Sequence, residues 1–369
     1  MISDGPPRPG ATAGASGFGR LLIVKLSALG DVAHALPIVD YLRRSAPEAE
    51  IDWAVDVRFA PLLAGHPGLR RVVALDIGLW RREWQAARTR RDVAEAVRSL
   101  RAARYDAAFD VQGNVKSGIV TFLSGAPLRF GFGRDGVREA PNLVFTNRKA
   151  RLLPIDVHIT QKVLRVASAP FGGAFDLSVL RAFVPTAPGD DARAAAIVRD
   201  LVGGAAPLLA VHAGTTWVTK KMDPGYWAEA IRSLRRRFPG LGILLTWGTE
   251  NERREAEGIL GMAGGAAGVA PRVTLKELAA LYRACGYMMA PDTGPLHVAA
   301  AAGAKTVSVF RATDGNRNAP RGAGHRFLQA PLPCTACLRK RCDQDAACRA
   351  SLSPEAAAEA MADLMDSRM

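Results

Sequence analysis

Long hydrophobic runs are missing from this 369-residue sequence, although 49% of its residues are hydrophobic. No apolar stretch approaches the ~20 residues that a helix needs to cross a bilayer, which argues against a membrane-spanning segment. Residues 1–18 are rich in Gly, Pro, Ala and Ser and lack the basic start and apolar centre of a secretory signal. We therefore expect a disordered leader followed by a globular protein of about two domains.

The glycines of a dinucleotide-binding turn are also missing. The first turn, 25–31, holds one glycine, Gly30, where that fingerprint needs three, and it lacks the lysine–serine pair of a P-loop. A nicotinamide-dependent oxidoreductase is therefore disfavoured. What remains is Asp31, a carboxylate at a strand-to-helix turn. It is either a helix N-cap or a base that accepts a proton from a hydroxyl.

Acidic residues are the scarcer charged kind, since Lys and Arg number 49, Asp and Glu 35, and the formal net charge is +14. Such an excess predicts an acidic partner: nucleic acid, an anionic membrane surface or a phosphorylated substrate. The sequence has no helix-turn-helix, RNA-binding or finger signature, and no aromatic platforms among its basic residues. These absences disfavour nucleic acid, but a basic nucleic-acid-binding protein stays open as an alternative from another class.

Short apolar runs alternate with amphipathic segments along most of the chain, a pattern typical of parallel sheets flanked by helices. In the first half we expect strands at 20–25, 51–55, 71–76 and 105–110, and helices at 32–44, 88–104 and from 116. In the second half we expect strands at 208–212, 242–246, 287–290 and 306–310, and helices at 226–238, 251–262 and 274–284. The predicted fold is α/β, with two Rossmann-like doubly wound domains at 19–185 and 207–330 facing across a cleft. A connector at 186–206 joins them, and a cysteine-rich tail with a terminal helix follows at 331–369.

The stretch 290–301 is predicted to be a turn between a buried strand and an Ala-rich helix. Helix starts offer free backbone N–H groups and the positive end of the helix dipole, so anionic groups bind there. Asp292 and Thr293 can cap this helix, while Thr293, Gly294 and His297 face a ligand. Taken alone, the stretch is equally well an N-cap with a buried histidine.

Two further loops follow strands of the second half. Thr215 and Thr216 supply donors and Lys220 a mobile cation, which is how a diphosphate leaving group would be held. Glu252 follows the next strand and could present its carboxylate to a ribose diol. The alternative for the first loop is a solvated loop with two lysines, and the alternative for Glu252 is a pair of acids at a helix N-terminus.

Together these stretches resemble the ADP-heptose:lipopolysaccharide heptosyltransferases, inverting GT-B enzymes of glycosyltransferase family 9, over most of residues 20–355. Segments 79–84, 110–117 and 138–141 are most similar to the heptosyltransferase I branch, with heptosyltransferase II as the alternative. The resemblance implies transfer of L-glycero-D-manno-heptose from ADP-heptose to the Kdo of lipid A–Kdo2, in lipopolysaccharide core synthesis. It implies a cytoplasmic enzyme, peripheral on the anionic inner face of the inner membrane, that needs no cofactor for catalysis.

The resemblance also implies roles for particular residues. Asp31 matches the general base, and Lys220 assists catalysis. The donor-binding positions are Thr215, Thr216, Lys220, Glu252, Asp292, Thr293, Gly294 and His297. The acceptor-binding positions are Arg81, Arg82, Gln112 and Lys116.

Cysteine is scarce, with five residues, but four of them fall in one short segment: Cys334, Cys337, Cys342 and Cys348. Four thiolates lie within metal-ligand reach there, and the basic residues 339–341 would help to ionise them. Similar clusters occur in related heptosyltransferases, some of which hold a metal. We expect a structural Zn or Fe site, with reduced thiols as the alternative and disulfides least favoured in a cytosolic enzyme.

Overall fold

Residues 17–367, which the computed structural model describes, contain two six-stranded parallel sheets. The first consists of β1 (Arg20–Val24), β2 (Glu50–Asp56), β3 (Arg71–Leu75), β4 (Ala107–Asp110), β5 (Leu128–Phe132) and β6 (Arg148–Ala150). The second consists of β7 (Leu208–Val211), β8 (Gly242–Leu245), β9 (Ala267–Val269), β10 (Gly286–Pro291), β11 (Lys305–Phe310) and β12 (His325–Gln329). Their orders, β3-β2-β1-β4-β5-β6 and β12-β11-β10-β7-β8-β9, are the same doubly wound order. The predicted α/β fold is confirmed.

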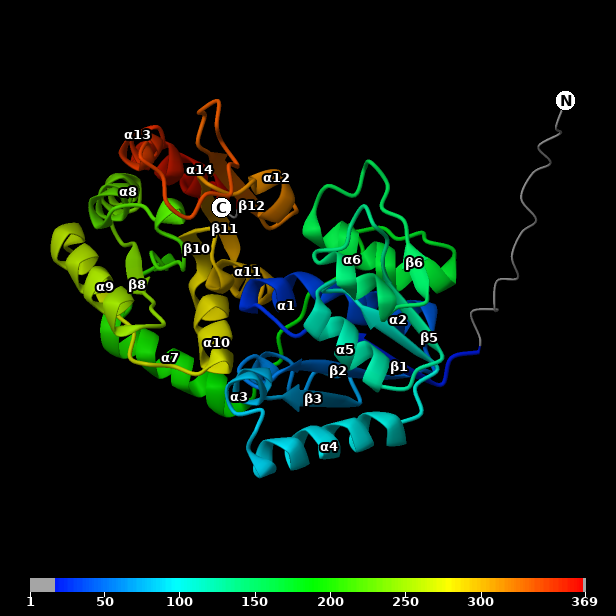
Figure 1. Ribbon diagram of the computed structural model, residues 1–369. Helices are drawn as coiled ribbons and strands as arrows, with labels where there is room; N and C mark the ends of the chain where they lie inside the picture. The colour runs from blue at the N-terminus through cyan, green and yellow to red at the C-terminus, as the bar shows by residue number, and fades with distance from the viewer. Residues whose placement is uncertain (1–16, 368–369) are drawn as a thin grey trace, which may run out of the picture.

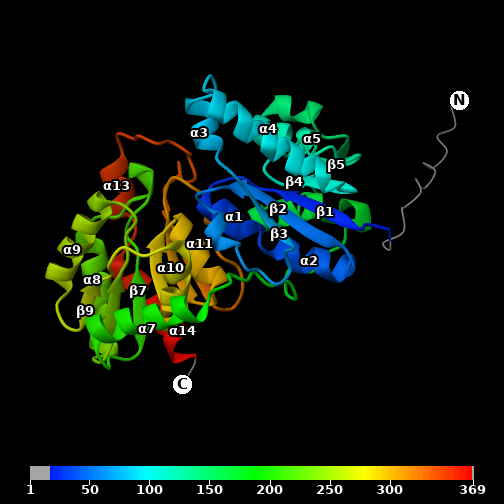
Figure 2. The same ribbon diagram turned by 90° about the horizontal axis from the view of Figure 1, so that it is seen from below.

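Helices cover both faces of each sheet (Figures 1 and 2). Those of the first half are α1 (Leu29–Ala35), α2 (Pro37–Ser45), α3 (Ile77–Arg82), α4 (Ala87–Ala102), α5 (Val115–Leu123) and α6 (Ile159–Ser168), with 3-10 turns η1 (Ala60–Leu62), η2 (Ala140–Val144) and η3 (Ala169–Phe171). Those of the second half are α7 (Pro188–Val202), α8 (Pro224–Arg237), α9 (Glu250–Ala263), α10 (Leu275–Cys285), α11 (Gly294–Ala301), α12 (Gly315–Asn318), α13 (Asp345–Ala350) and α14 (Pro354–Asp366), with η4 (Val218–Lys220). No helix within residues 17–367 has the length and hydrophobicity to cross a membrane.

Alternation along β1 explains why both faces of the first sheet are covered. Leu21 and Ile23 belong to the cluster under α1, α2 and α6, whereas Leu22 and Val24 belong to the cluster under α4 and α5. Successive side chains of a strand point to opposite faces. The continuous apolar run of β1 therefore requires a helical layer on each side.

One predicted helix, 32–44, is two helices in the structure. α1 ends at Ala35 and α2 begins at Pro37. Proline has no backbone N–H to donate and its ring clashes with the carbonyl four residues earlier, so it favours the first turn of a new helix.

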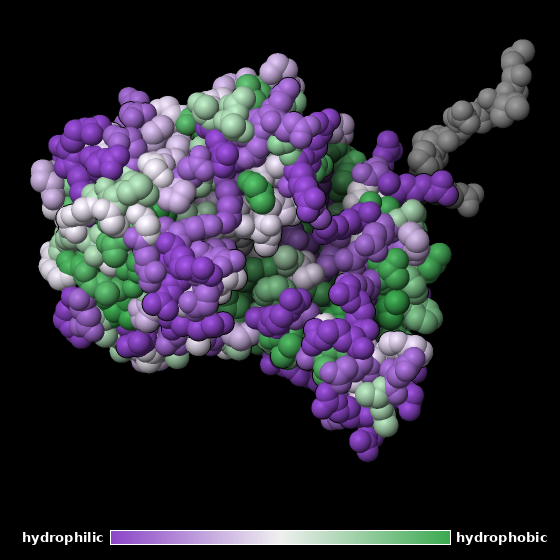
Figure 3. Space-filling view, turned by 60° about the vertical axis from the view of Figure 1, so that its left-hand side comes forward, coloured by the Kyte–Doolittle hydropathy of each residue, from purple (hydrophilic) through white to green (hydrophobic). Residues whose placement is uncertain are grey.

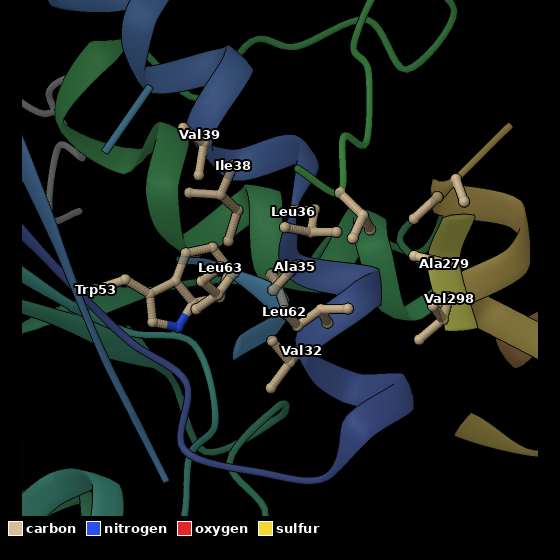
Figure 4. Packing of buried hydrophobic residues seen from close by; sticks show 14 of the residues in the cluster. Val32, Ala35, Leu36, Ile38, Val39, Trp53, Leu62, Leu63, Ala279 and Val298 are labelled. Atoms are coloured by element: carbon tan, nitrogen blue, oxygen red, sulfur yellow. The ribbon is translucent and has the colours of Figure 1, made fainter. Parts of the chain in front are cut away.

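The two halves share a hydrophobic core. Val32 of α1 and Leu36, the residue after α1, belong to the same buried cluster as Ala279 of α10 and Val298 of α11. Figure 4 shows these side chains close to one another where the two sets of helices meet. In Figure 1, α1 and α11 lie next to each other between the lobes, and their backbones are in contact.

The segments that flank the two predicted domains pack against them. Residues 1–16 of the expected leader lie outside the described residues, and the ring centroid of Phe18 lies 5.7 Å from that of Phe171. α7, within the expected connector, packs on α10, β8 and β9, while α14 packs on α8 and β11. The surface is largely hydrophilic, with scattered hydrophobic residues, and is recessed between the lobes (Figure 3).

Candidate active site

The turn after β1 carries Asp31 in the first turn of α1. Its side chain is half-buried, and Oδ2 accepts a hydrogen bond of 3.2 Å from the backbone N–H of Ala28. The side chain of Gln112 fixes the start of this turn, because its Oε1 accepts from the N–H groups of Leu26 (2.6 Å) and Ser27 (3.1 Å). Gln112, a predicted acceptor-binding residue, is buried, and its hydrogen bonds support the turn that carries Asp31.

Lys25, a residue that the sequence reasoning passed over, lies beneath the same turn. Its side chain is buried, and Nζ donates to the carbonyl of Val111 at 3.3 Å. Burial lowers the pKa of Lys25, while the carboxylates of Asp31 and Asp110 oppose that shift. The only sequence signal was a lysine at the end of an apolar strand.

Asp292 is the centre of the second half of the site. Its buried Oδ2 accepts from Lys220 Nζ and from Thr313 Oγ1, both at 2.7 Å, and its backbone carbonyl accepts from Thr215 Oγ1 at 3.1 Å. His297 Nε2 lies 3.5 Å from Oδ1. Burial would raise the pKa of Asp292, but the hydrogen bond from His297 and the charge of Lys220 lower it well below the usual range.

The start of α11 leaves its backbone donors unclaimed by a side-chain cap. Thr293 is the N-cap residue, but its side chain makes no capping hydrogen bond. Free N–H groups at a helix start favour an anion. His297 is buried, and its Nδ1 has no hydrogen-bond partner among residues 17–367. The backbone donors at the start of α11 are therefore left for a ligand, whereas Nδ1 of His297 is a buried atom without a partner in the described part of the chain.

The two turns meet directly. A Cβ placed on Gly30 would lie 2.7 Å from His297 Cδ2 and 3.4 Å from the Cα of Gly294. A Cβ on Gly294 would in turn lie 3.0 Å from the side chain of Leu29. The absence of a side chain at Gly30 and Gly294 lets α1 and α11 approach closely, which brings Asp31 beside the 292–297 loop.

Three histidines gather at this contact, and the sequence reasoning predicted only one of them. The ring centroid of His34 lies 4.1 Å from that of His297 and 5.4 Å from that of His158. His158 Nε2 lies 2.9 Å from the carbonyl oxygen of Ala319 in the other half. Burial and the neighbouring histidines lower the pKa of His34 well below its usual value, and burial lowers that of His158 to about 4.

The loop after β7 places its predicted residues differently. Thr215 is buried against Asp292, whereas Thr216 is exposed. Lys220 Nζ lies 4.7 Å from the ring centroid of Trp217, and Lys340 Nζ lies 5.3 Å from the same ring. Cations favour such positions over an indole face. Lys220 of this loop and Lys340 of the cysteine segment therefore share one indole ring, and Lys220 also contacts Asp292.

Glu252 caps its own helix. Its Oε2 accepts from the N–H groups of Gly248 (2.9 Å) and Thr249 (3.0 Å) at the start of α9. Its Oε1 lies against Gly214, where an added Cβ would come within 2.3 Å. The carboxylate therefore stands beside the β7 loop, in the position that the helix-capping alternative describes.

The remaining acceptor candidates are separate from Asp31. Arg81 and Arg82 end α3 after β3, and Lys116 begins α5 after β4; all three are exposed. The strands of this sheet are parallel, so these loops lie at the same edge as the Asp31 turn.

The cysteine segment does not fit the expected metal site at Cys334, Cys337, Cys342 and Cys348. All four are free thiols, and no group of three or more His, Cys, Asp or Glu within residues 17–367 could hold a metal ion. Backbone bonds from Ala336 to Arg311 (3.3 Å) and from Leu338 to Ala312 (2.8 Å) lay the segment along the second domain. Cys348 packs on that domain's core, so the thiols are not gathered around one point.

The chain is similar in sequence to known proteins. The profile of Glycosyltransferase family 9 (heptosyltransferase) matches residues 93–347. The chain is 33% identical to lipopolysaccharide heptosyltransferase 1 of Pseudomonas aeruginosa, over 88% of this chain and 87% of that protein. It is 27% identical to lipopolysaccharide heptosyltransferase 1 of Escherichia coli K12, over 85% and 94% respectively.

Solved structures agree in fold. E. coli heptosyltransferase WaaC with ADP-2-deoxy-2-fluoro heptose superposes with a TM-score of 0.68 at 28% identity, covering 86% of this chain and 97% of WaaC. E. coli ADP-heptose lps heptosyltransferase II gives a TM-score of 0.72 at 18% identity, over 95% and 100%, a likeness of fold alone.

Proposed function

The chain belongs to glycosyltransferase family 9, and from that premise we propose that it moves L-glycero-D-manno-heptose from ADP-heptose to the Kdo of lipid A–Kdo2. It is a GT-B glycosyltransferase with the function of heptosyltransferase I. Heptosyltransferase II is the alternative, and the cysteine segment is the feature that favours it.

One observation carries the assignment of residues: the close approach of Gly30 to His297. It puts Asp31 on one side of the domain junction and the Asp292 loop on the other. A base from the first domain and a leaving-group site from the second then face the same space. This is what a transfer between two bound substrates requires.

In the proposed mechanism, Asp31 accepts the proton of the acceptor hydroxyl as that oxygen attacks the anomeric carbon of the heptose. The bond between the anomeric carbon and the phosphate oxygen breaks in the same displacement, so the configuration inverts and ADP leaves with the electron pair. Gln112 and Lys25 hold the turn that aims Asp31.

Charge that develops on the diphosphate needs fixed donors. The free N–H groups of α11, the hydroxyl of Thr216 and the ammonium of Lys220 supply them. Lys220 is held 2.7 Å from Asp292 and can turn toward the diphosphate while keeping its place in the loop. Glu252, beside Gly214, is the proposed partner of the ribose.

The acceptor enters from the first domain, where Arg81, Arg82 and Lys116 offer exposed cations to its phosphates. Because this acceptor is a lipid, we place the enzyme at the inner face of the cytoplasmic membrane as a peripheral protein.

The test is to incubate the protein with ADP-heptose and either Kdo2-lipid A or its heptosylated product, and to weigh the lipid by mass spectrometry. We expect one heptose to be added to Kdo2-lipid A. Addition to the heptosylated lipid alone would instead assign heptosyltransferase II, and addition to neither would refute the proposal.

A further inference from the structure

α5 has an outer face that does not match a solvated helix. Residues 117, 118, 120 and 121 of α5 are buried, so the helix is firmly seated on the sheet. Its outward stripe is Lys116, Ile119 and Phe122, spaced by three residues and therefore aligned along one side. Ile119 is 41% exposed and Phe122 49% exposed. A helix face open to water normally carries polar residues, and large apolar ones there indicate a binding surface.

The apolar area continues onto η2. The ring centroids of Phe122 and Phe145 lie 6.3 Å apart, and an added Cβ on Gly118 would meet the ring of Phe145 at 2.6 Å. Val144, next to Phe145, is 76% exposed. Ile119, Phe122 and Val144 thus belong to two packed elements; we call them the apolar face.

Cations border the apolar face. The guanidinium of Arg129 lies 5.4 Å from the ring centroid of Phe122, and its Nε donates to the carbonyl of Phe145 at 2.9 Å. Arg101 donates to the carbonyl of Leu123 at 3.3 Å, where α5 ends. Lys116 and Arg148 are exposed, on α5 itself and on β6, the strand that follows η2 in the chain. An apolar centre with a basic border suits an anionic lipid surface, since the side chains enter the headgroup layer while the cations meet its phosphates.

The apolar face is also coupled to the active site. α5 follows directly from the loop of Gln112, whose side chain fixes the turn that carries Asp31. From Lys116 to Phe122 the helix rises only about 9 Å. A bilayer against Phe122 would therefore hold a lipid-borne sugar within reach of that edge of the sheet.

We propose that Ile119, Phe122 and Val144, with Lys116, Arg101, Arg129 and Arg148 around them, dock the enzyme on an anionic membrane. This rests on the proposed function, which makes the acceptor a lipid. The occupant is the bilayer surface itself.

The experiment compares binding of the full chain to phosphatidylcholine vesicles with and without phosphatidylglycerol, by co-sedimentation. Phe122→Asp should lower the partition coefficient for the anionic vesicles about tenfold or more, because it removes a partly buried aromatic and adds repulsion. Val144→Asp should also lower the partition coefficient. Because Val144 is highly exposed, this substitution should not unfold the protein, so weaker binding would report the loss of a membrane contact. Arg148→Gln should lower binding about fivefold, and only to the anionic vesicles.

Met262→Asp is the matched control. Met262 is 43% exposed on α9, in the other domain, and the substitution adds the same charge. Its vesicle binding should equal that of the parent protein. The docking surface would be overturned if Phe122→Asp and Val144→Asp bound anionic vesicles as well as the parent protein does. It would also be overturned if Met262→Asp lost as much vesicle binding as they do. The proposal would also be overturned if the protein formed a dimer in vesicle-free solution and Val144→Asp dissociated that dimer. The apolar face would then bind a second copy of the chain and not a membrane.

Turnover measurements distinguish failure of the docking surface from failure of the proposed glycosyltransferase function. With a deacylated, water-soluble Kdo acceptor, Phe122→Asp and Val144→Asp should react as fast as the parent, whereas with the acceptor in vesicles they should be slower. Failure of every protein on the soluble acceptor would refute the proposed function, while the co-sedimentation result would still decide the docking surface.

Discussion

Replacing Gly30 by alanine tests the contact on which the site assignment depends. Gly30 is the second residue of α1, so alanine suits its helical backbone and would by itself stabilise the fold by about 1 kcal/mol. The new Cβ would lie 2.7 Å from Cδ2 of His297. That ring cannot easily withdraw, because it lies between His34 (centroids 4.1 Å apart) and Asp292 (3.5 Å from Nε2). Forcing a methyl group into such packing costs about 1–3 kcal/mol.

The gain offsets only part of the cost, so Gly30→Ala should lower the free energy of unfolding by at most about 2 kcal/mol. Activity should suffer more, because a shift of the α11 start by about 1 Å lowers kcat/KM on the order of 10- to 100-fold. Gly258→Ala is the control, since a Cβ there meets nothing within 4 Å in α9. It should stabilise the protein and leave kcat/KM unchanged. If Gly30→Ala gave the same stabilisation with full activity, the close approach of the two turns would have no catalytic meaning.

Four further changes test the roles of individual residues. Asp31→Asn should leave ADP affinity nearly intact by calorimetry while turnover falls by about 10²-fold or more, and normal turnover would remove Asp31 from the mechanism. Lys220→Ala should weaken ADP binding by roughly 1–3 kcal/mol; unchanged affinity would count against the loop assignment. Arg81→Ala with Arg82→Ala should raise the KM of the lipid acceptor more than that of the donor, and equal changes would contradict their acceptor role. The pKa of His158 is lowered to about 4 from 6.5, so the unfolded chain binds more protons between those pH values. Urea unfolding should therefore show stability falling by up to about 3 kcal/mol from pH 6.5 to pH 4, with a shallower slope in His158→Gln.

Most central strands were predictable, and so was the edge strand β3, whereas the edge strands β6, β9 and β12 were not. β1 and β10 are buried on both faces, so their sequences are continuous apolar runs bounded by turn residues. β6 (Arg148–Ala150) and β9 (Ala267–Val269) have three residues each at sheet edges, where little apolar surface is buried. β5 includes Arg129 and Gly131, which break the pattern in the same way.

Some residues of the candidate site could be predicted from the sequence and others could not. Asp31 and Asp292 could be found from the sequence because each follows a recognisable strand. The support that Gln112 gives to Leu26 could not be found, since it joins residues 86 positions apart. The same is true of His158, which is far from His34 in the sequence and meets it only in the folded structure. The cysteine spacing suggested a metal, but the backbone bonds that spread the segment over the second domain have no local signature.

The shared interior of the two halves limits how the enzyme can open. Val32 and Leu62 on one side and Ala279 and Val298 on the other form one dry contact, fully or almost fully withdrawn from water. Parting the lobes there would wet all of these surfaces at once. Substrate entry and product exit should therefore proceed by rotation about this contact as a fixed pivot, with the widest travel at the rim farthest from α1 and α11.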